Sequence, residues 1–118
     1  MGDFRKLNVW QKAKDLAVNI YRLTNQGAIS SDYGLRDQIR RAAVSVPSNI
    51  AEGDELDTDK QSIKHFFYAK GSVAELLTQL LISFEIGYID KTTYEKIEEE
   101  CKAISSMLAR LIQARKKP

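Results

Sequence analysis

Apolar residues recur every three or four positions along nearly the whole chain, and this spacing constrains the fold more than any other feature. Such spacing places side chains on one face of an α-helix, which completes a turn in about 3.6 residues. The pattern predicts four helices, at about residues 4 to 25, 32 to 53, 58 to 87, and from 90 to the closing ARKKP. No segment alternates apolar and polar residues as a half-buried strand does. We therefore predict an all-α protein.

The joins between these segments carry signals that end one helix and begin the next. Thr58 and Gln61 fit a capping box at the start of the third helix, and Asp90 suits the N-cap of the fourth. Gly87 fits a left-handed cap at the end of the third helix. Because short joins between long helices favour antiparallel neighbours, we predict an antiparallel up-down-up-down four-helix bundle. It forms a single domain over residues 1–118.

The composition fits one globular core. Of the 118 residues, 43% are hydrophobic and 29% are charged, which is typical of folded proteins and argues against disorder. The single cysteine, Cys101, cannot form an internal disulfide and suits a reducing compartment. The chain has no charged-then-apolar leader, and no apolar run approaches the roughly 20 residues of a membrane span. We expect a soluble, cytoplasmic protein with no membrane contact.

The first and third helices carry more apolar residues than one core stripe uses. Trp10, Ala17 and Tyr21 lie away from the stripe of the first helix, and Phe67 and Ile82 lie outside that of the third. One interpretation is that these residues only widen the core, since monomers also expose much apolar surface. We favour a homo-oligomer whose subunits bury these faces, because contiguous exposed apolar patches usually mark interfaces.

Residues that support catalysis or metal binding do not form a recognisable set. His65 is the only histidine and Cys101 the only cysteine, so the chain cannot supply a zinc site or the paired Glu-x-x-His motifs of a di-iron bundle. Cys101 falls in the core stripe of the fourth helix, which favours a buried thiol over a nucleophile. The sequence has no glycine-rich phosphate loop. We expect a protein that is not an enzyme and that uses no metal or cofactor.

Positive charge is concentrated locally. The candidate nucleic-acid-binding residues lie on the second helix and the first: Arg36, Arg40 and Arg41, with Lys12 and Lys14. Clustered arginines suit phosphate oxygens, because the planar guanidinium binds them bidentately and releases counterions. They suit salt bridges equally well, and Asp37 and the acidic segment DELD are candidate partners. The residues alone do not decide between the two.

The stretch SVPSNIAEG, residues 45–53, places a proline inside the second helix. Pro47 has no N–H for the carbonyl of Ala43, so we predict a kink near Pro47. A polar ribbon runs beside the core stripe of this helix and consists of Gln38, Arg41, Ser45, Asn49 and Glu52. We favour a structural role for the ribbon over ligand binding. In this role Arg41 and Glu52 each form an ion pair with a residue of a neighbouring subunit, and Asn49 forms a hydrogen bond with a loop.

Three segments of the chain resemble a known family. They read LNVWQKAKDLAVNIY, YGLRDQIRRAAVSVPSNIAEG and FFYAKGSVAELLTQLLISFEIGYI. Together they resemble the bacterial four-helix-bundle proteins encoded within 23S rRNA intervening sequences, which are similar to the accessory variability determinant protein of diversity-generating retroelements. The resemblance implies an antiparallel bundle that assembles as a homopentameric barrel with a basic surface. Intervening-sequence members have been labelled ribosomal proteins, a label of ribosome association that reflects genomic location more than function.

The resemblance implies two functions. Because the retroelement relatives bind nucleic acid and a reverse transcriptase, one is an oligomeric accessory protein that binds structured RNA or RNA/DNA through its basic surface. The other is a scaffold that presents a pentamer to a partner such as a reverse transcriptase. The family has no catalytic residues to carry over, so the matching positions are candidate motif or subunit-interface residues: Ser45, Pro47, Asn49, Glu52 and Gly53, with Trp10 and Tyr21. The acidic DELD segment departs from the family, whose members tend to be more basic at this position. This difference argues against nucleic-acid binding.

Overall fold

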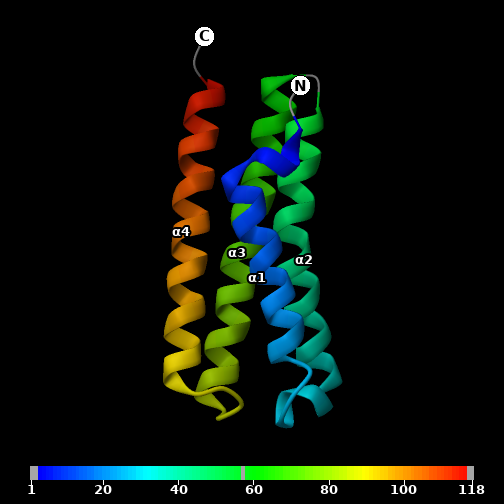
Figure 1. The fold of residues 1–118 in the computed structure, drawn as a ribbon, viewed down its shortest axis with the longest axis vertical. Helices are drawn as coiled ribbons and strands as arrows, with labels where there is room; N and C mark the ends of the chain where they lie inside the picture. Colours follow the sequence, from blue (N-terminus) through cyan, green and yellow to red (C-terminus); the bar gives the residue numbers. More distant parts are fainter. Residues whose placement is uncertain (1–2, 57, 117–118) are drawn as a thin grey trace.

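Four long helices make up most of the chain in the computed structural model, which describes residues 3–56 and 58–116. They are α1 (Asn8–Leu23), α2 (Tyr33–Glu55), α3 (Asp59–Glu85) and α4 (Lys91–Lys116), and the short 3-10 helices η1 (Phe4–Lys6) and η2 (Ala28–Ser31) precede α1 and α2. Successive long helices run in opposite directions (Figure 1). The described residues contain no strand, so the predicted all-α four-helix bundle is confirmed.

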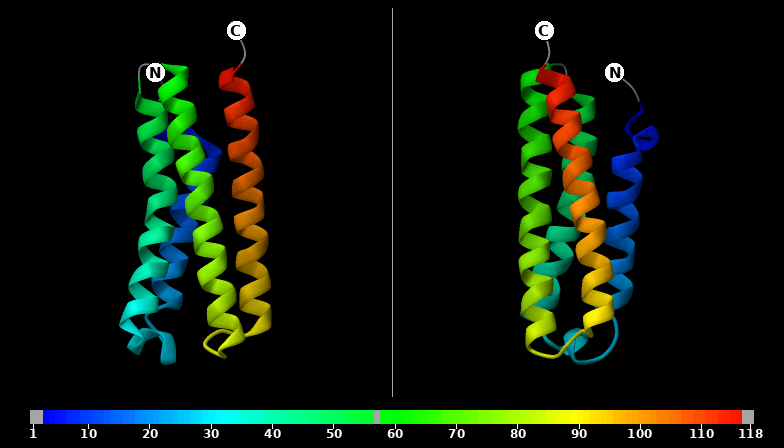
Figure 2. Two further views of the ribbon diagram at one scale, coloured as in Figure 1. Left: turned by 180° about the vertical axis from the view of Figure 1, so that it is seen from behind. Right: turned by 90° about the vertical axis from the view of Figure 1, so that its left-hand side faces the viewer.

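The helices pack side by side into a rod of 48 × 20 × 20 Å. α2 packs most extensively against α3, and α3 and α1 each pack against their next neighbours in the chain. The contact between α1 and α4 is the smallest of the four that close the bundle. Two further views show the same arrangement, with α1 and α4 at the two ends of the chain path (Figure 2). The seam between α1 and α4 is therefore the loosest part of the bundle.

The ends of the helices are held by the capping residues expected from the sequence. The Thr58 hydroxyl accepts a hydrogen bond from the backbone N–H of Gln61 at 3.2 Å, and the Asp90 carboxylate accepts one from Thr93 at 2.7 Å. Gly87 has φ of +88°, in the left-handed region that favours glycine. The N–H of the residue after it, Tyr88, bonds back to the carbonyl of the last full turn of α3, as in a Schellman cap. The hydrogen bonds expected at the start of α3 and at the start of α4, and the glycine cap at the end of α3, are present.

The core fills the space between the four helices with aliphatic side chains and the aromatic rings of Phe66 and Tyr94. Ala17, which the spacing placed outside the core, is 8% exposed and belongs to it, because its small side chain lets α1 approach its neighbours. α2 runs two residues past Gly53 and continues through the buried Pro47 without interruption. The kink near Pro47 stays a prediction.

Candidate nucleic-acid and subunit interfaces

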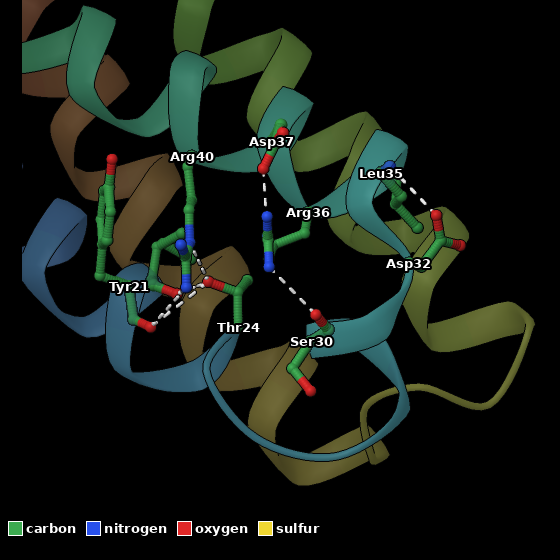
Figure 3. Close-up of polar contacts among 9 residues, drawn as sticks. Tyr21, Thr24, Ser30, Asp32, Leu35, Arg36, Asp37 and Arg40 are labelled. Carbon is green, nitrogen blue, oxygen red and sulfur yellow. Dashed lines mark hydrogen bonds and ion pairs between the residues drawn. The ribbon is translucent and has the colours of Figure 1, made fainter.

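Arg40 joins α2 to the end of α1. Its guanidinium donates to the Thr24 hydroxyl at 2.8 Å and to the Tyr21 carbonyl at 3.5 Å, and lies 4.5 Å from the centre of the Tyr21 ring (Figure 3). Thr24 is fully buried and bonds back to the Ile20 carbonyl at 2.7 Å. A cation beside the last carbonyls of a helix interacts favourably with the helix dipole. Arg40 therefore closes the C-terminal end of α1.

Arg36 makes a similar set of contacts one turn earlier. Its guanidinium donates to Asp37 at 3.0 Å and to the Ser30 carbonyl at 3.1 Å (Figure 3), and it lies 4.8 Å from the centre of the Tyr33 ring. Only 25% of the Arg36 side chain is exposed. The ion pair with Asp37 is one of the salt bridges that the sequence predicted as an alternative to phosphate binding. Both arginines thus have partners within the chain.

The other three predicted nucleic-acid-binding residues are exposed. Arg41 forms no ion pair or hydrogen bond with another described residue. Lys14 is paired with Asp15 at 2.7 Å. Lys12 lines a groove of about 430 Å³ between α1 and α4 that also contains Glu99 and two other acidic side chains. The structure does not bring the five predicted residues together into one basic site.

The polar ribbon of α2 bonds to α3 within the same chain. The hydroxyls of Ser45 and Ser72 are 2.8 Å apart, and the Asn49 amide nitrogen donates to the carbonyl and hydroxyl of Ser45 at 2.9 and 3.1 Å. The Asn49 oxygen lies 3.2 Å from His65 Nδ1, so this ring nitrogen must donate. Glu52 lies 3.7 Å from the same nitrogen. The expectation that Asn49 bonds to a loop is wrong, since its partners lie on α2 and α3.

The residue directly after the family motif, Asp54, joins α2 to the end of α4. Asp54 is 7% exposed, and Arg115 donates to its Oδ1 at 3.1 Å, while Oδ2 is buried without a hydrogen-bond partner among the described residues. Gly53 lies against the Phe66 ring so closely that a Cβ would come within 2.6 Å of a ring carbon. The DELD segment therefore contributes its first residue to a bond with Arg115, not with the α2 arginines.

Large apolar side chains remain exposed on two separate parts of the bundle. On one side, Val18, Tyr21 and Val44 border a groove of about 390 Å³ between α1 and α2, with Pro47 in its lining. On α3, the exposed apolar residues are Phe67, Tyr68, Leu81 and Ile82, and the exposed Ile86 caps its C-terminal end. Trp10 is half-buried and packs edge-on against Phe4, with 5.2 Å between ring centres, so its ring belongs partly to the fold of its own chain.

The single cysteine lies in surroundings that suppress nucleophilic chemistry. Cys101 is fully buried, and burial raises the pKa of its thiol to about 12. A thiol with so high a pKa carries almost no thiolate at neutral pH. Among the described residues, no three or more His, Cys, Asp or Glu side chains converge as a metal site requires. Within residues 3–56 and 58–116, no helix has the length and apolarity to cross a membrane.

These features define a class: an all-α, up-and-down four-helix bundle whose second helix bonds through Ser45 to α3 and through Asp54 to α4. More particularly, the chain belongs to the 23S rRNA-intervening sequence protein family, whose sequence profile matches residues 5–110. The resemblance inferred from the sequence is confirmed. No curated protein shows significant similarity to the chain.

A solved structure shares the fold. It is the crystal structure of a protein with unknown function from the S23 ribosomal protein family of Bacteroides thetaiotaomicron. It superposes with a TM-score of 0.83 at 23% sequence identity, over 89% of this chain and 95% of that chain. At this identity the likeness supports the bundle architecture and carries nothing about ligands.

Proposed function

We propose that this protein is a non-catalytic, cytoplasmic, oligomeric accessory protein that binds structured RNA or RNA/DNA through exposed cations. The observation that carries this proposal is that several exposed lysine and arginine side chains form no ion pair with a described residue. Arg41, Lys60 and Lys64 are exposed and form no ion pair with a described residue. Uncommitted cations of this kind can neutralise phosphates and release counterions. The resemblance to the retroelement accessory proteins, which bind nucleic acid, agrees with this function.

The two exposed apolar areas support the oligomeric part of the proposal. The groove bordered by Val18 and Val44 lies between α1 and α2, whereas Ile82 lies on α3 and Ile86 caps the C-terminal end of that helix. When two different patches on one chain bury each other, the contact is head-to-tail, and repeating it gives a ring if the rotation closes. A homopentamer, as the family resemblance implies, is a ring of this type. Each subunit would then contribute its free cations to one assembly.

A second candidate function is a protein-interaction scaffold, in which the oligomer presents identical faces to a partner such as a reverse transcriptase. The observation that favours it is the bonding of Arg36 and Arg40 inside the chain, which removes the two most clustered arginines from a phosphate site. In this function the protein does not contact nucleic acid. Arg40→Ala then changes stability or assembly and has no effect on RNA.

Filter binding with an RNA hairpin, repeated across a salt series, tests the proposed function. We expect retention at about 50 mM salt and a linear fall of log affinity with log salt concentration, because each neutralised phosphate releases counterions. Arg41→Ala should lower the magnitude of the slope by roughly 0.7 to 0.9. Arg41 is the informative position because its side chain forms no bond within the chain, unlike Arg40.

The control for this experiment is Lys14→Ala, since Lys14 is already paired with Asp15. It should change the slope less than Arg41→Ala does. Absence of retention by the unaltered protein at about 50 mM salt, where phosphate contacts are strong, would reject RNA binding and leave the scaffold function.

A further inference from the structure

One part of the outer surface combines aromatic rings with lysines and is distinct from the arginine cluster of α2. We call it the aromatic–lysine surface and define it by Lys60, Lys64, Phe67, Tyr68 and Lys116. The two rings are 47% and 48% exposed, so nearly half of each side chain is open to solvent. α3 has no acidic residue between Asp59 and Glu75. The part of α3 that these side chains occupy therefore carries lysines and uncharged residues, and no negative charge.

Each ring has a lysine ammonium close to its centre. Lys64 Nζ is 5.9 Å from the centre of the Tyr68 ring, and Lys116 Nζ is 5.7 Å from that of Phe67. These distances are at the outer limit of a cation–π contact, so the interactions are weak and the ammonium groups stay accessible. A phosphate can therefore reach each cation while a flat group lies on the neighbouring ring.

The family motif supports the Tyr68 side of this surface. His65 packs edge-on against Tyr68, with 5.4 Å between ring centres, and its Nδ1 is held by the Asn49 oxygen. Asn49 is held in turn by its two hydrogen bonds to Ser45. The chain of contacts from α2 through His65 limits the orientations that the Tyr68 ring can take.

The residue directly after the motif, Asp54, supports the Phe67 side through α4. Arg115 bonds to the buried carboxylate of Asp54, and its guanidinium lies 5.4 Å from the centre of the Phe66 ring. This pair fixes the last turn of α4, from which the next residue, Lys116, reaches Phe67. Two elements that are distant in sequence, α3 and the end of α4, thus build the surface together.

We propose that the aromatic–lysine surface binds an unpaired segment of RNA, with bases stacked on Phe67 and Tyr68 and phosphates beside Lys60, Lys64 and Lys116. Stacking requires bases that are not already stacked in a duplex, which selects loops and single strands. The charge complementarity selects a polyanion over an apolar protein partner, since each exposed ring has a cation beside it. This proposal rests on the proposed function and names the part of an RNA that the protein holds.

Fluorescence anisotropy with a single-stranded RNA of about 12 nucleotides, a length within the range of such sites, tests the proposal against a duplex of the same sequence. The unaltered protein should bind the single strand more tightly than the duplex. Phe67→Leu and Tyr68→Leu should each weaken single-strand binding about tenfold, because they keep apolar volume and remove the ring. Phe67→Trp keeps a ring and should retain the affinity. Lys64→Ala should lower the salt slope by about 0.7.

Tyr33→Leu is the matched control, because Tyr33 is also exposed and has a guanidinium over its ring, but that guanidinium is held by Asp37. It should bind as the unaltered protein does. Binding of both leucine variants within twofold of the unaltered protein would overturn the proposal, as would tighter binding of the duplex.

Two further outcomes separate this proposal from the more general one. If the unaltered protein binds neither the hairpin nor the single strand, the proposed function fails and this proposal fails with it. If the hairpin binds and the leucine variants bind it unchanged, only the aromatic–lysine surface is excluded. Sedimentation of Phe67→Leu completes the test, since dissociation of the oligomer with unchanged RNA affinity would make the surface a subunit contact and overturn the proposal.

Discussion

Gly53 illustrates how a single position of the family motif serves packing. It faces Phe66 across the α2–α3 contact, and a Cβ there would lie 2.6 and 2.9 Å from two ring carbons and 3.1 Å from the carbonyl oxygen of Ser62. Phe66 is fully buried, so its ring has little room to move away. The glycine is required by the close approach of two helices, and its backbone has ordinary helical geometry.

Gly53→Ala should therefore destabilise the protein despite the better helix propensity of alanine. We expect a loss of about 1 to 3 kcal/mol in the free energy of unfolding, the range typical of an overpacked core. Chemical denaturation followed by circular dichroism measures it. Gly34→Ala is the control, since that glycine lies near the start of α2 with nothing within 4 Å of an added Cβ, and it should leave stability unchanged or raise it by up to ~1 kcal/mol. Equal stability of the two variants would contradict the packing argument.

At the scale of the elements, bonds between distant segments tie both ends of the bundle. At one end, Arg115 of α4 bonds to Asp54 of α2. At the other, the Tyr88 hydroxyl in the α3–α4 connection donates to Asp32, the N-cap of α2, at 3.0 Å. This hydrogen bond raises the pKa of the Tyr88 phenol. The ties compensate for the small contact that α4 makes with α1.

Removing the cation of the first tie should be costly, because Asp54 would remain buried without a partner. For Arg115→Met we expect a loss of about 1 to 3 kcal/mol, less than the 3 to 5 typical of fully buried pairs, because 27% of the Arg115 side chain is exposed and solvent screens it. The double variant with Asp54→Asn should recover most of this loss, as a double-mutant cycle would show.

Arg110→Met, at an exposed position of α4, is the control for the tie and should change the free energy of unfolding by less than about 0.5 kcal/mol. If Arg115→Met changes the free energy of unfolding no more than Arg110→Met does, the Arg115–Asp54 pair makes no net contribution to stability.

At the scale of the whole molecule, the bundle has two apolar areas that its own core does not use. The groove between α1 and α2 and the exposed isoleucines of α3 lie on different elements, which is the arrangement that a head-to-tail assembly needs. The apolar spacing predicts more apolar residues on the first and third helices than one core stripe uses. The structure assigns Ala17 to the core instead, and leaves Tyr21 and Ile82 exposed at 45% and 47%.

Ile82→Asp should weaken the assembly without unfolding the subunit, because the side chain is nearly half exposed within its own chain and would be buried only between subunits. We expect sedimentation equilibrium to show an oligomer for the unaltered protein and smaller species for the variant. Thr78→Asp introduces the same charge at an exposed position one turn away. Comparing its sedimentation with that of Ile82→Asp shows whether weakening of the oligomer depends on the position of the charge. A monomeric unaltered protein at micromolar concentration would contradict the oligomer.

The number of helices, the caps of α3 and the N-cap of α4, and the family could be predicted from the sequence, because each depends on residues that are neighbours within one or two turns. Apolar spacing, the threonine at the start of α3 and the motif SVPSNIAEG are all local signals. The sequence also identified Asp37 as a candidate partner for the α2 arginines, since that residue is adjacent to Arg36.

The hydrogen-bond and ion-pair partners of the polar residues could be identified only in the folded structure. Arg40 bonds to Thr24 and Asn49 to His65, each 16 positions away, and Arg115 bonds to Asp54, 61 positions away. No local pattern specifies such pairs, because they depend on how the helices rotate and align when they pack. The same packing brings Lys116 to Phe67, and so builds from opposite parts of the chain a surface that the apolar and charge patterns did not reveal.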